Sequence, residues 1–325
     1  MITYKVYNNN FREWDTFIDQ SINGTIFHKQ QFLSYHINRD FNNHSLLFYK
    51  KNILIAVFPA SIIENILISH PGASFGGIIY SRISLNDLLQ ILDLIEEYAI
   101  KHKCINITMT PTPVIYNHKD ESLSYALRWK KYEEKEQYFA SIIPIQNNLH
   151  NQINQIIKNK SRTQKYYNNI IKKYNLEIVW INEFNEFYPI LKENKKKYNG
   201  KPTHTLDELN KINTLLPNAI KLLAIKKDGA VIGGNMIFMA KENIGIIFYN
   251  MIDYQFSAMQ ISTIQILESI KWAHENNIKY LDFGVSHESG EQHLLEPKMS
   301  LIKFKEEFGS FGVVRSVLSK NINGE

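Results

Sequence analysis

The sequence predicts an α/β (α+β) protein made of two similar domains, and three observations lead to this prediction. A chain of 325 residues exceeds the usual size of a single hydrophobic core, so two domains are expected. The apolar share of 44% and the charged share of 21% are typical of a soluble globular protein. In addition, strand and helix patterns of the first half recur in the second half at a nearly constant spacing.

The first repeated pattern predicts a β-hairpin in each half of the chain. SLLFYKKNILIAVFP, which begins at Ser45, aligns with KLLAIKKDGAVIGGN, which begins at Lys221, and Leu47 then matches Leu223 at an offset of 176. In both stretches two apolar strands are joined by a short polar turn, KKN or KKDG, which is typical of a hairpin.

The second repeated pattern predicts a helix that leads into a strand. QILDLIEEYAIKHKCINITM, from Gln90, aligns with QILESIKWAHENNIKYLDFG, from Gln265, at an offset of 175. Apolar residues fall on one helical face in each copy, and INITM or KYLDF follows as a strand. Each copy therefore has the order hairpin, further strand, loop, helix, strand. The residues on the two helical faces are Ile91, Ile95 and Tyr98, and Ile266, Ile270 and Ala273.

A long polar helical pattern, NLHNQINQIIKNKSRTQKYYNNIIKKYN, separates the two copies and is expected to open the second domain. We place the boundary near Pro144 to Asn148, which gives an N-terminal domain over 1–146 and a C-terminal domain over 147–310. No glycine- or serine-rich linker joins the two halves, so we expect them to pack together.

The composition excludes several classes of protein. The single cysteine, Cys104, rules out an intrachain disulfide and a cysteine-based zinc cluster and favours a cytoplasmic location; its apolar neighbours predict a buried, inert thiol. No apolar run is long enough to span a bilayer, and the first residues lack the pattern of a signal peptide. The net charge of +5 gathers in two lysine-rich segments. These are either solvated helix faces or a surface that meets a phosphate, a nucleotide or RNA, and neither has the density of a DNA-binding arm.

The order of these elements resembles the GNAT acyltransferase fold, and a tandem pair of them resembles the Fem family of aminoacyl transferases and related bacterial N-acyltransferases. Four stretches carry the resemblance: INGTIFHKQQFLSYH, SHPGASFGGIIY, KNKSRTQKYYNNIIKKYNLEIVW, and YLDFGVSHE followed by SLIKFKEEFG. The resemblance covers almost the whole chain and implies two GNAT-like domains, each with a mixed central sheet flanked by helices. It also implies that the last segment, 311–325, returns to the first domain.

The donor-binding turn of ordinary GNAT enzymes is absent from this sequence. Those enzymes hold the pyrophosphate of CoA with a Q/R-x-x-G-x-G/A turn at a helix N-terminus, whereas this chain has IYSRISLND and IDYQFSAMQIST at the corresponding places. The resemblance therefore leaves two donors. One is acetyl-CoA or another acyl-CoA held in a different way, and the other is the aminoacyl-tRNA used by the Fem relatives, which also lack the turn.

The segment after KYLDF supplies the candidate catalytic residues. Asp282, Ser286, His287 and Glu288 are expected to leave the C-terminal end of a strand and line a cleft, where open α/β sheets commonly bind ligands. His287 and Glu288 are candidates for accepting a proton from an attacking amine, and Asp282 either joins them or bonds to neighbouring backbone. The alternative is an exposed polar loop. A metal site is not expected, because His287 and His293 are six residues apart, unlike the histidines of HExxH.

Further candidates are expected to bind substrate. Lys303 and Lys305 flank Phe304 in LIKFKEEFG, so in a strand the two lysines would share one face. The resemblance assigns Lys305 to an anionic or carbonyl group of the substrates, and Arg162 to a phosphate. Each of these residues has a structural alternative: a lysine exposed on the surface, an arginine in a salt bridge, or a residue that only forms a turn. The turn YNGKPTH and the strand GIIFYN, which the resemblance places at the acyl group, supply the remaining candidates: Tyr198, Lys201, His204, Tyr249 and Asn250.

The resemblance implies a cytoplasmic N-acyltransferase without a metal, in which the acceptor amine attacks the donor directly and the protein orients both partners. We expect transfer of an acyl group, first of all acetyl from acetyl-CoA, to the amine of a nucleotide-linked amino sugar for a cell-surface glycan. One alternative is a Fem-like ligase that takes an amino acid from aminoacyl-tRNA to a peptidoglycan precursor. Another is a non-catalytic binding protein that has kept the fold.

Overall fold

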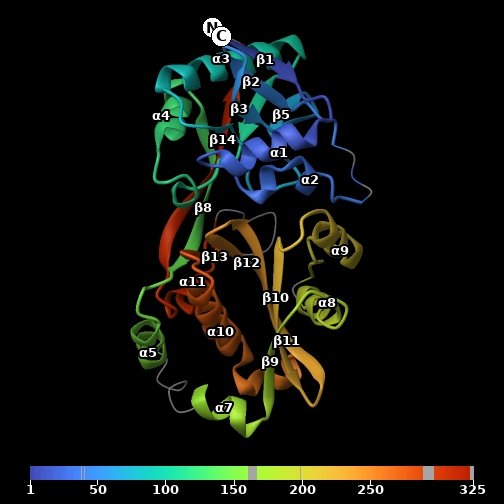
Figure 1. The fold of residues 1–325 in the computed structure, drawn as a ribbon, viewed down its shortest axis with the longest axis vertical. Helices are drawn as coiled ribbons and strands as arrows, with labels where there is room; N and C mark the ends of the chain where they lie inside the picture. Colours follow the sequence, from blue (N-terminus) through green and yellow to red (C-terminus); the bar gives the residue numbers. More distant parts are fainter. Residues whose placement is uncertain (38, 40, 160–166, 198, 288–295, 323–325) are drawn as a thin grey trace. The chain divides into compact units, whose positions relative to one another are not determined.

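The structure is a computed structural model that describes residues 1–325 except 38, 40, 160–166, 198, 288–295 and 323–325 (Figure 1). By its packing the chain divides into two compact units, residues 1–138 with 313–325, and residues 139–312. The strands β8 (Glu133–Pro144) and β14 (Phe311–Asn321) each begin in one unit and end in the other. The domain limits derived from the sequence, 1–146, 147–310 and 311–325, stay a prediction.

The strands of the first unit form two groups. One is an antiparallel sheet in the order β1 (Ile2–Val6), β2 (Leu46–Lys50), β3 (Ile53–Phe58), β6 (Ile79–Tyr80). The other has the order β4 (Ser61–Ile63), β5 (Ile66–Ser69), β7 (Asn106–Met109), β14, β8, with β5 and β7 parallel. The predicted first hairpin is confirmed as β2 and β3, whose turn residues Lys51 and Asn52 both have positive φ.

The longest helix of the first unit covers its core. In α3 (Leu85–Lys101) the hydroxyl of Ser84 accepts a hydrogen bond from the N–H of Asp87 and caps the helix. The predicted apolar face of α3 is buried, and Cys104 lies in the same core, where burial raises the pKa of its thiol. The other helical segments of this unit are α1 (Phe11–Gln20), η1 (Ile26–His28), α2 (Gln30–Leu33), η2 (Val114–Tyr116) and α4 (Ser122–Trp129).

Two side chains of α1 hold the segment INGTIFHKQQF in place. The carboxylate of Asp15 accepts hydrogen bonds from the N–H groups of Gln30 (2.6 Å) and Gln31 (3.3 Å) at the start of α2. The indole N–H of Trp14 donates to the carbonyl of His28 at 2.7 Å. Because Asp15 is almost fully buried, its charged form is disfavoured, and burial raises the pKa of this carboxyl to about 6.

The raised pKa of Asp15 predicts an unusual dependence of stability on pH. Its value in the unfolded chain is near 3.8, so the stabilising contribution of the protonated carboxyl is complete below that pH and is lost as pH rises through about 6. Relative to an Asp15→Asn variant, the natural protein should therefore gain on the order of 2 kcal/mol of unfolding free energy as pH falls through this range. Urea unfolding of both proteins at several pH values measures this difference. A difference that does not change with pH would contradict the assignment.

The second unit is built on a mixed sheet in the order β8, β13 (Tyr280–Val285), β12 (Ile244–Ile252), β11 (Ala230–Lys241), β10 (Ile220–Lys227), β9 (Leu176–Ile181). Strands β12 and β13 are parallel, and the other neighbours are antiparallel. The second predicted hairpin is confirmed as β10 and β11, with Asp228 and Gly229 at positive φ in its turn.

Helices lie on both faces of the second unit's sheet (Figure 1). On one face α10 (Ile261–Glu275) shares a core with Ile225, Ile237 and Ile247 of the strands. On the other face, just before α8 (Tyr188–Lys196), the ring of Phe187 lies directly against Gly234 of β11. The remaining helices are α5 (Leu149–Asn159), α7 (Tyr167–Lys173), α9 (Leu206–Leu215), η3 (Tyr254–Met259) and α11 (Met299–Glu306).

The two repeated patterns of the sequence, the hairpin and the helix that leads into a strand, are confirmed in both units. The hairpin β10/β11, the helix α10 and the strand β13 correspond to β2/β3, α3 and β7 of the first unit. Each unit contains parallel and antiparallel strand pairs flanked by helices, so the predicted α/β fold class is also confirmed. None of the described helices is long and apolar enough to cross a lipid bilayer.

Candidate active site

The parallel strands β12 and β13 of the second unit separate after a short paired stretch. They pair only through Ile244–Ile246 and Tyr280–Asp282. Beyond this point β13 pairs with β8 at Val285 and Ala140, while β12 continues to Ile252 alongside β11. The residues that follow Ile246 and Asp282 therefore border a place where the sheet is open between two parallel strands.

A β-bulge in β12 lies at this opening. Tyr249 pairs with Met236 and Ile247 with Ile237, so Phe248 has no register partner on β11, and β13 has already diverged. Because of the extra residue, Phe248 and Tyr249 both project to the side of the sheet that holds His204. Bulges are common next to active sites, where they redirect side chains.

Tyr249 is the centre of a buried cluster of hydrogen-bonded residues on that side of the sheet. Its hydroxyl lies 3.1 Å from the N–H of Thr203 and 3.0 Å from Nδ1 of His204, and the ring of His204 stacks on Phe238. The arrangement that satisfies all three groups has the hydroxyl accept from Thr203 and donate to His204 Nδ1. Burial raises the pKa of Tyr249 to about 12, so the hydroxyl is neutral at physiological pH. Tyr249 and His204, both predicted site residues, are thus brought together.

The end of β13 gathers four other predicted residues. Asp282 is fully buried, and its carboxylate accepts a hydrogen bond from the N–H of Gly284 at 2.5 Å. The buried ammonium of Lys305 donates to the carbonyls of Gly284 (3.0 Å) and Val285 (3.1 Å). Nε2 of His287 accepts from the N–H of Phe139 at 3.2 Å, which places the proton of the neutral ring on Nδ1. The fourth residue of this group is Ser286.

Two buried polar atoms flank the opening without a partner in the described part of the chain. The hydroxyl of Ser286 follows β13, and Oδ1 of Asn250 lies on β12. Buried polar atoms usually form a hydrogen bond, so these two atoms are suited to bonding a bound molecule. The opening therefore offers hydrogen-bonding groups on both strands.

The expectation of a strand at LIKFKEEFG is wrong, because this segment forms the helix α11. Residues two apart on a helix project about 200° from each other, so Lys303 is exposed while Lys305 is buried. The four-residue spacing of Phe304 and Phe308, whose ring centroids are 5.2 Å apart, was the signal for a helix. Only Lys305 of the predicted lysine pair contacts the β13 cluster.

The remaining predicted residues are Lys201, Arg162, Tyr198 and Glu288. Lys201 is exposed. Arg162, Tyr198 and Glu288 lie outside the described residues, so their assigned roles stay predictions. Among the described side chains, no three His, Cys, Asp or Glu residues gather in a way that could hold a metal ion.

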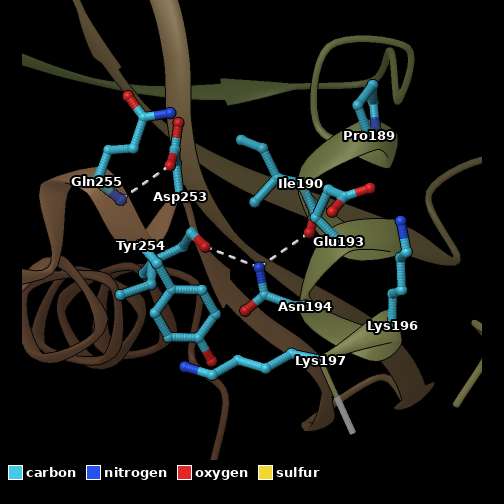
Figure 2. Close-up of a pocket in the computed structure, with 10 residues that line it drawn as sticks. Pro189, Ile190, Glu193, Asn194, Lys196, Lys197, Asp253, Tyr254 and Gln255 are labelled. Carbon is cyan, nitrogen blue, oxygen red and sulfur yellow. Dashed lines mark hydrogen bonds between the residues drawn. The ribbon is translucent and has the colours of Figure 1, made fainter. Parts of the chain in front are cut away.

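A pocket that the sequence did not indicate lies beside the end of β12 (Figure 2). It has a volume of about 700 Å³ and is lined by residues of α8, by Lys197, by the end of β12, and by Asp253 with the start of η3. Asn194 fixes its floor, because its amide donates to the carbonyls of Ile190 (2.9 Å) and Ile252 (2.7 Å). At its rim the ammonium of Lys197 lies 3.6 Å from the centroid of the Tyr254 ring. In the sequence this region was marked by the lysine-rich KENKKK segment and by IDYQFSAMQIST, which stands where ordinary GNAT enzymes have the pyrophosphate turn.

Comparison with known proteins shows likeness in structure but not in sequence. No protein-family model matches the chain, and no curated protein matches it. FemX aligns with a TM-score of 0.74 and 13% identity over 98% of this chain and 98% of FemX. L-PGS from Bacillus licheniformis aligns with a TM-score of 0.60 and 12% identity over 97% of this chain and 92% of its own. A tandem GNAT protein from the clavulanic acid biosynthesis pathway aligns with a TM-score of 0.54 and 7% identity over 100% of both chains.

These alignments define the class of fold. The chain has a tandem GNAT-like fold, as the sequence resemblance implied. More particularly, the fold is Fem-like, since the structural likeness to FemX extends over nearly the full length of both proteins.

Proposed function

We propose that this protein is an N-acyltransferase whose acyl donor lies at the opening between β12 and β13. The observation that carries the proposal is the separation of these parallel strands after Ile246 and Asp282, beside the bulge at Phe248, in a fold shared with FemX. The acceptor amine attacks the acyl carbon directly, and the bond to the donor's leaving oxygen or sulfur breaks. The protein contributes orientation and hydrogen bonds to the developing oxyanion.

The donor favoured by these observations is an aminoacyl-tRNA, with a peptidoglycan precursor as acceptor. The segment between β12 and α10 lacks the glycine turn that grips CoA and instead forms η3, ending at Gln260 with φ of 52°. The Fem-like resemblance of the whole chain favours the same donor. The orphan Ser286 hydroxyl and Asn250 amide would bind polar atoms of the transferred group or of the attacking amine.

A second candidate is acetyl transfer from acetyl-CoA to a nucleotide-linked amino sugar. The pocket beside β12 favours this reading, because its lining offers an aromatic ring together with the side chains of Glu193, Asp253 and Gln255. An aromatic surface with a few polar groups suits a hydroxylated ring such as a sugar.

The two donors are distinguished by direct binding measurements. We expect isothermal titration with uncharged tRNA to show binding that weakens steeply with salt, and titration with acetyl-CoA to show none. Acetyl-CoA binding without salt-sensitive tRNA binding would support the sugar acetyltransferase instead. If neither ligand binds, the proposal falls and a non-catalytic binding protein becomes the better account.

A further inference from the structure

The ammonium of Lys195 lies beside the candidate active site, although the sequence pattern did not distinguish this lysine from its neighbours. It lies in the last turn of α8, next to Asn194, whose amide ties this turn to the carbonyl of Ile252 at 2.7 Å. The helix end is thereby fixed against β12, and the ammonium of Lys195 lies over the face of Tyr249, 5.6 Å from the ring centroid. The opposite edge of the same helix turn faces the pocket of Figure 2.

The ammonium of Lys195 is partly buried without a countercharge. Within the described part of the chain it forms no ion pair and no side-chain hydrogen bond, and its contact is with the Tyr249 ring. Its neighbours Lys192 and Lys196 on the same helix are exposed to water. Burial lowers the pKa of Lys195, because the charged form loses hydration that no acidic group replaces.

The acidic groups of this region are directed elsewhere. Glu193 lines the pocket of Figure 2, and the carboxylate of Glu208 accepts from the N–H of Thr205 at 2.8 Å as part of a helix cap. Tyr249, which Lys195 contacts, keeps its proton because its pKa is raised to about 12. A partly buried cation of this kind is usually paired, so the missing anion is expected to come from a ligand.

We propose that Lys195 binds an anionic group of the substrate, a phosphate or a carboxylate, beside Tyr249. This inference rests on the proposed function in one respect: it assumes that the substrate binds on the side of the sheet where Tyr249 lies. The ammonium acts as a point charge whose three N–H groups can turn toward the ligand, while the neutral Tyr249 hydroxyl stays engaged with Thr203 and His204. Both proposed donors and the nucleotide-linked acceptors carry phosphates, and peptide-bearing acceptors carry carboxylates.

The test uses the charge of Lys195 itself rather than turnover. The lysines are dimethylated with ¹³C-formaldehyde and a borane reductant, which preserves their charge, and the Lys195 signal is assigned by its loss in Lys195→Arg. We expect the pKa of Lys195 to lie below the ordinary value of a lysine and to rise when pyrophosphate or succinate is added, because a bound anion favours the ammonium. A response to pyrophosphate alone identifies a phosphate site, and a response to succinate alone a carboxylate site. No response to either anion overturns the proposal.

A pair of variants provides a second measurement. Lys195→Met should fold and unfold at a higher temperature than the natural protein, because methionine removes the desolvated charge and keeps the packing. It should also bind the responding anion at least about tenfold more weakly, whereas the exposed Lys192→Met should bind it unchanged. Unaltered anion binding by Lys195→Met would overturn the inference. If Lys195 binds the anion but no acyl transfer is found, the inference stands and the proposed function falls.

Discussion

Replacing Lys305 with methionine should lower the free energy of unfolding by about 3 kcal/mol, because two carbonyl oxygens at the end of β13 would lose a charged donor. The buried ammonium of Lys305 is hydrogen-bonded to Gly284 and Val285, immediately before Ser286 and His287. Losing it should also allow the end of β13 to move, so acyl transfer should fall together with stability. Urea unfolding and hydrogen exchange of the β13 peptide measure these two effects.

Lys303→Met is the matched control for this substitution. Lys303 lies on the same helix two residues earlier but is exposed, so its replacement should change stability by no more than about 0.5 kcal/mol. Hydrogen exchange of β13 should be the same as in the natural protein. Similar losses in the two variants would show that the contacts of Lys305 with β13 are not the cause.

The second large effect is expected at Gly76, in the HPGASFGG loop of the first unit. A Cβ atom at this position would lie 1.9 Å from the carbonyl oxygen of Ser69 and 2.5 Å from the backbone nitrogen of His70. Both atoms belong to the backbone, so neither can rotate away. Gly76→Ala should therefore cost about 3 kcal/mol or more, and the variant is expected to accumulate poorly in soluble form. Glycine is needed at position 76 because two backbone segments approach each other closely there.

Gly229→Ala separates this steric effect from a conformational one. Gly229 has φ of 82° in the β10/β11 turn, and a Cβ atom there would meet nothing within 4 Å. Its replacement should cost only about 1 kcal/mol, from the left-handed conformation alone. Thermal unfolding of both variants makes the comparison. An effect at Gly229 as large as that at Gly76 would contradict the crowding argument.

The architecture was predictable because the spacing of apolar and turn residues along the chain indicates each strand and helix locally. The KKN and KKDG turns give the two hairpins, and the apolar residues of α3 and α10 repeat at helical spacing in both halves. Where two periods compete over a short span, the prediction fails: Lys303 and Lys305 alternate as in a strand, while Phe304 and Phe308 have the spacing of a helix.

The candidate site was only partly predictable, because its geometry depends on contacts between distant segments. Asp282, Ser286 and His287 follow a strong strand pattern, so their gathering at the end of β13 could be expected. Residue type suggested His204 and Tyr249, but their hydrogen bond joins residues 45 positions apart and depends on the bulge at Phe248. Lys195 was hidden in a lysine-rich run, since only packing against Tyr249 distinguishes it from its exposed neighbours.

The most direct test of the account is whether the protein acylates an amine. The purified protein would be incubated with a peptidoglycan precursor and a mixture of aminoacyl-tRNAs, and separately with a nucleotide-linked amino sugar and acetyl-CoA, with the acceptors analysed by mass spectrometry. The account predicts that one acceptor gains the mass of an aminoacyl or acetyl group at its amine, and that Lys305→Met loses most of this activity while Lys303→Met keeps it. An unchanged acceptor mass in both reactions, with a folded protein, would contradict the assignment as an N-acyltransferase.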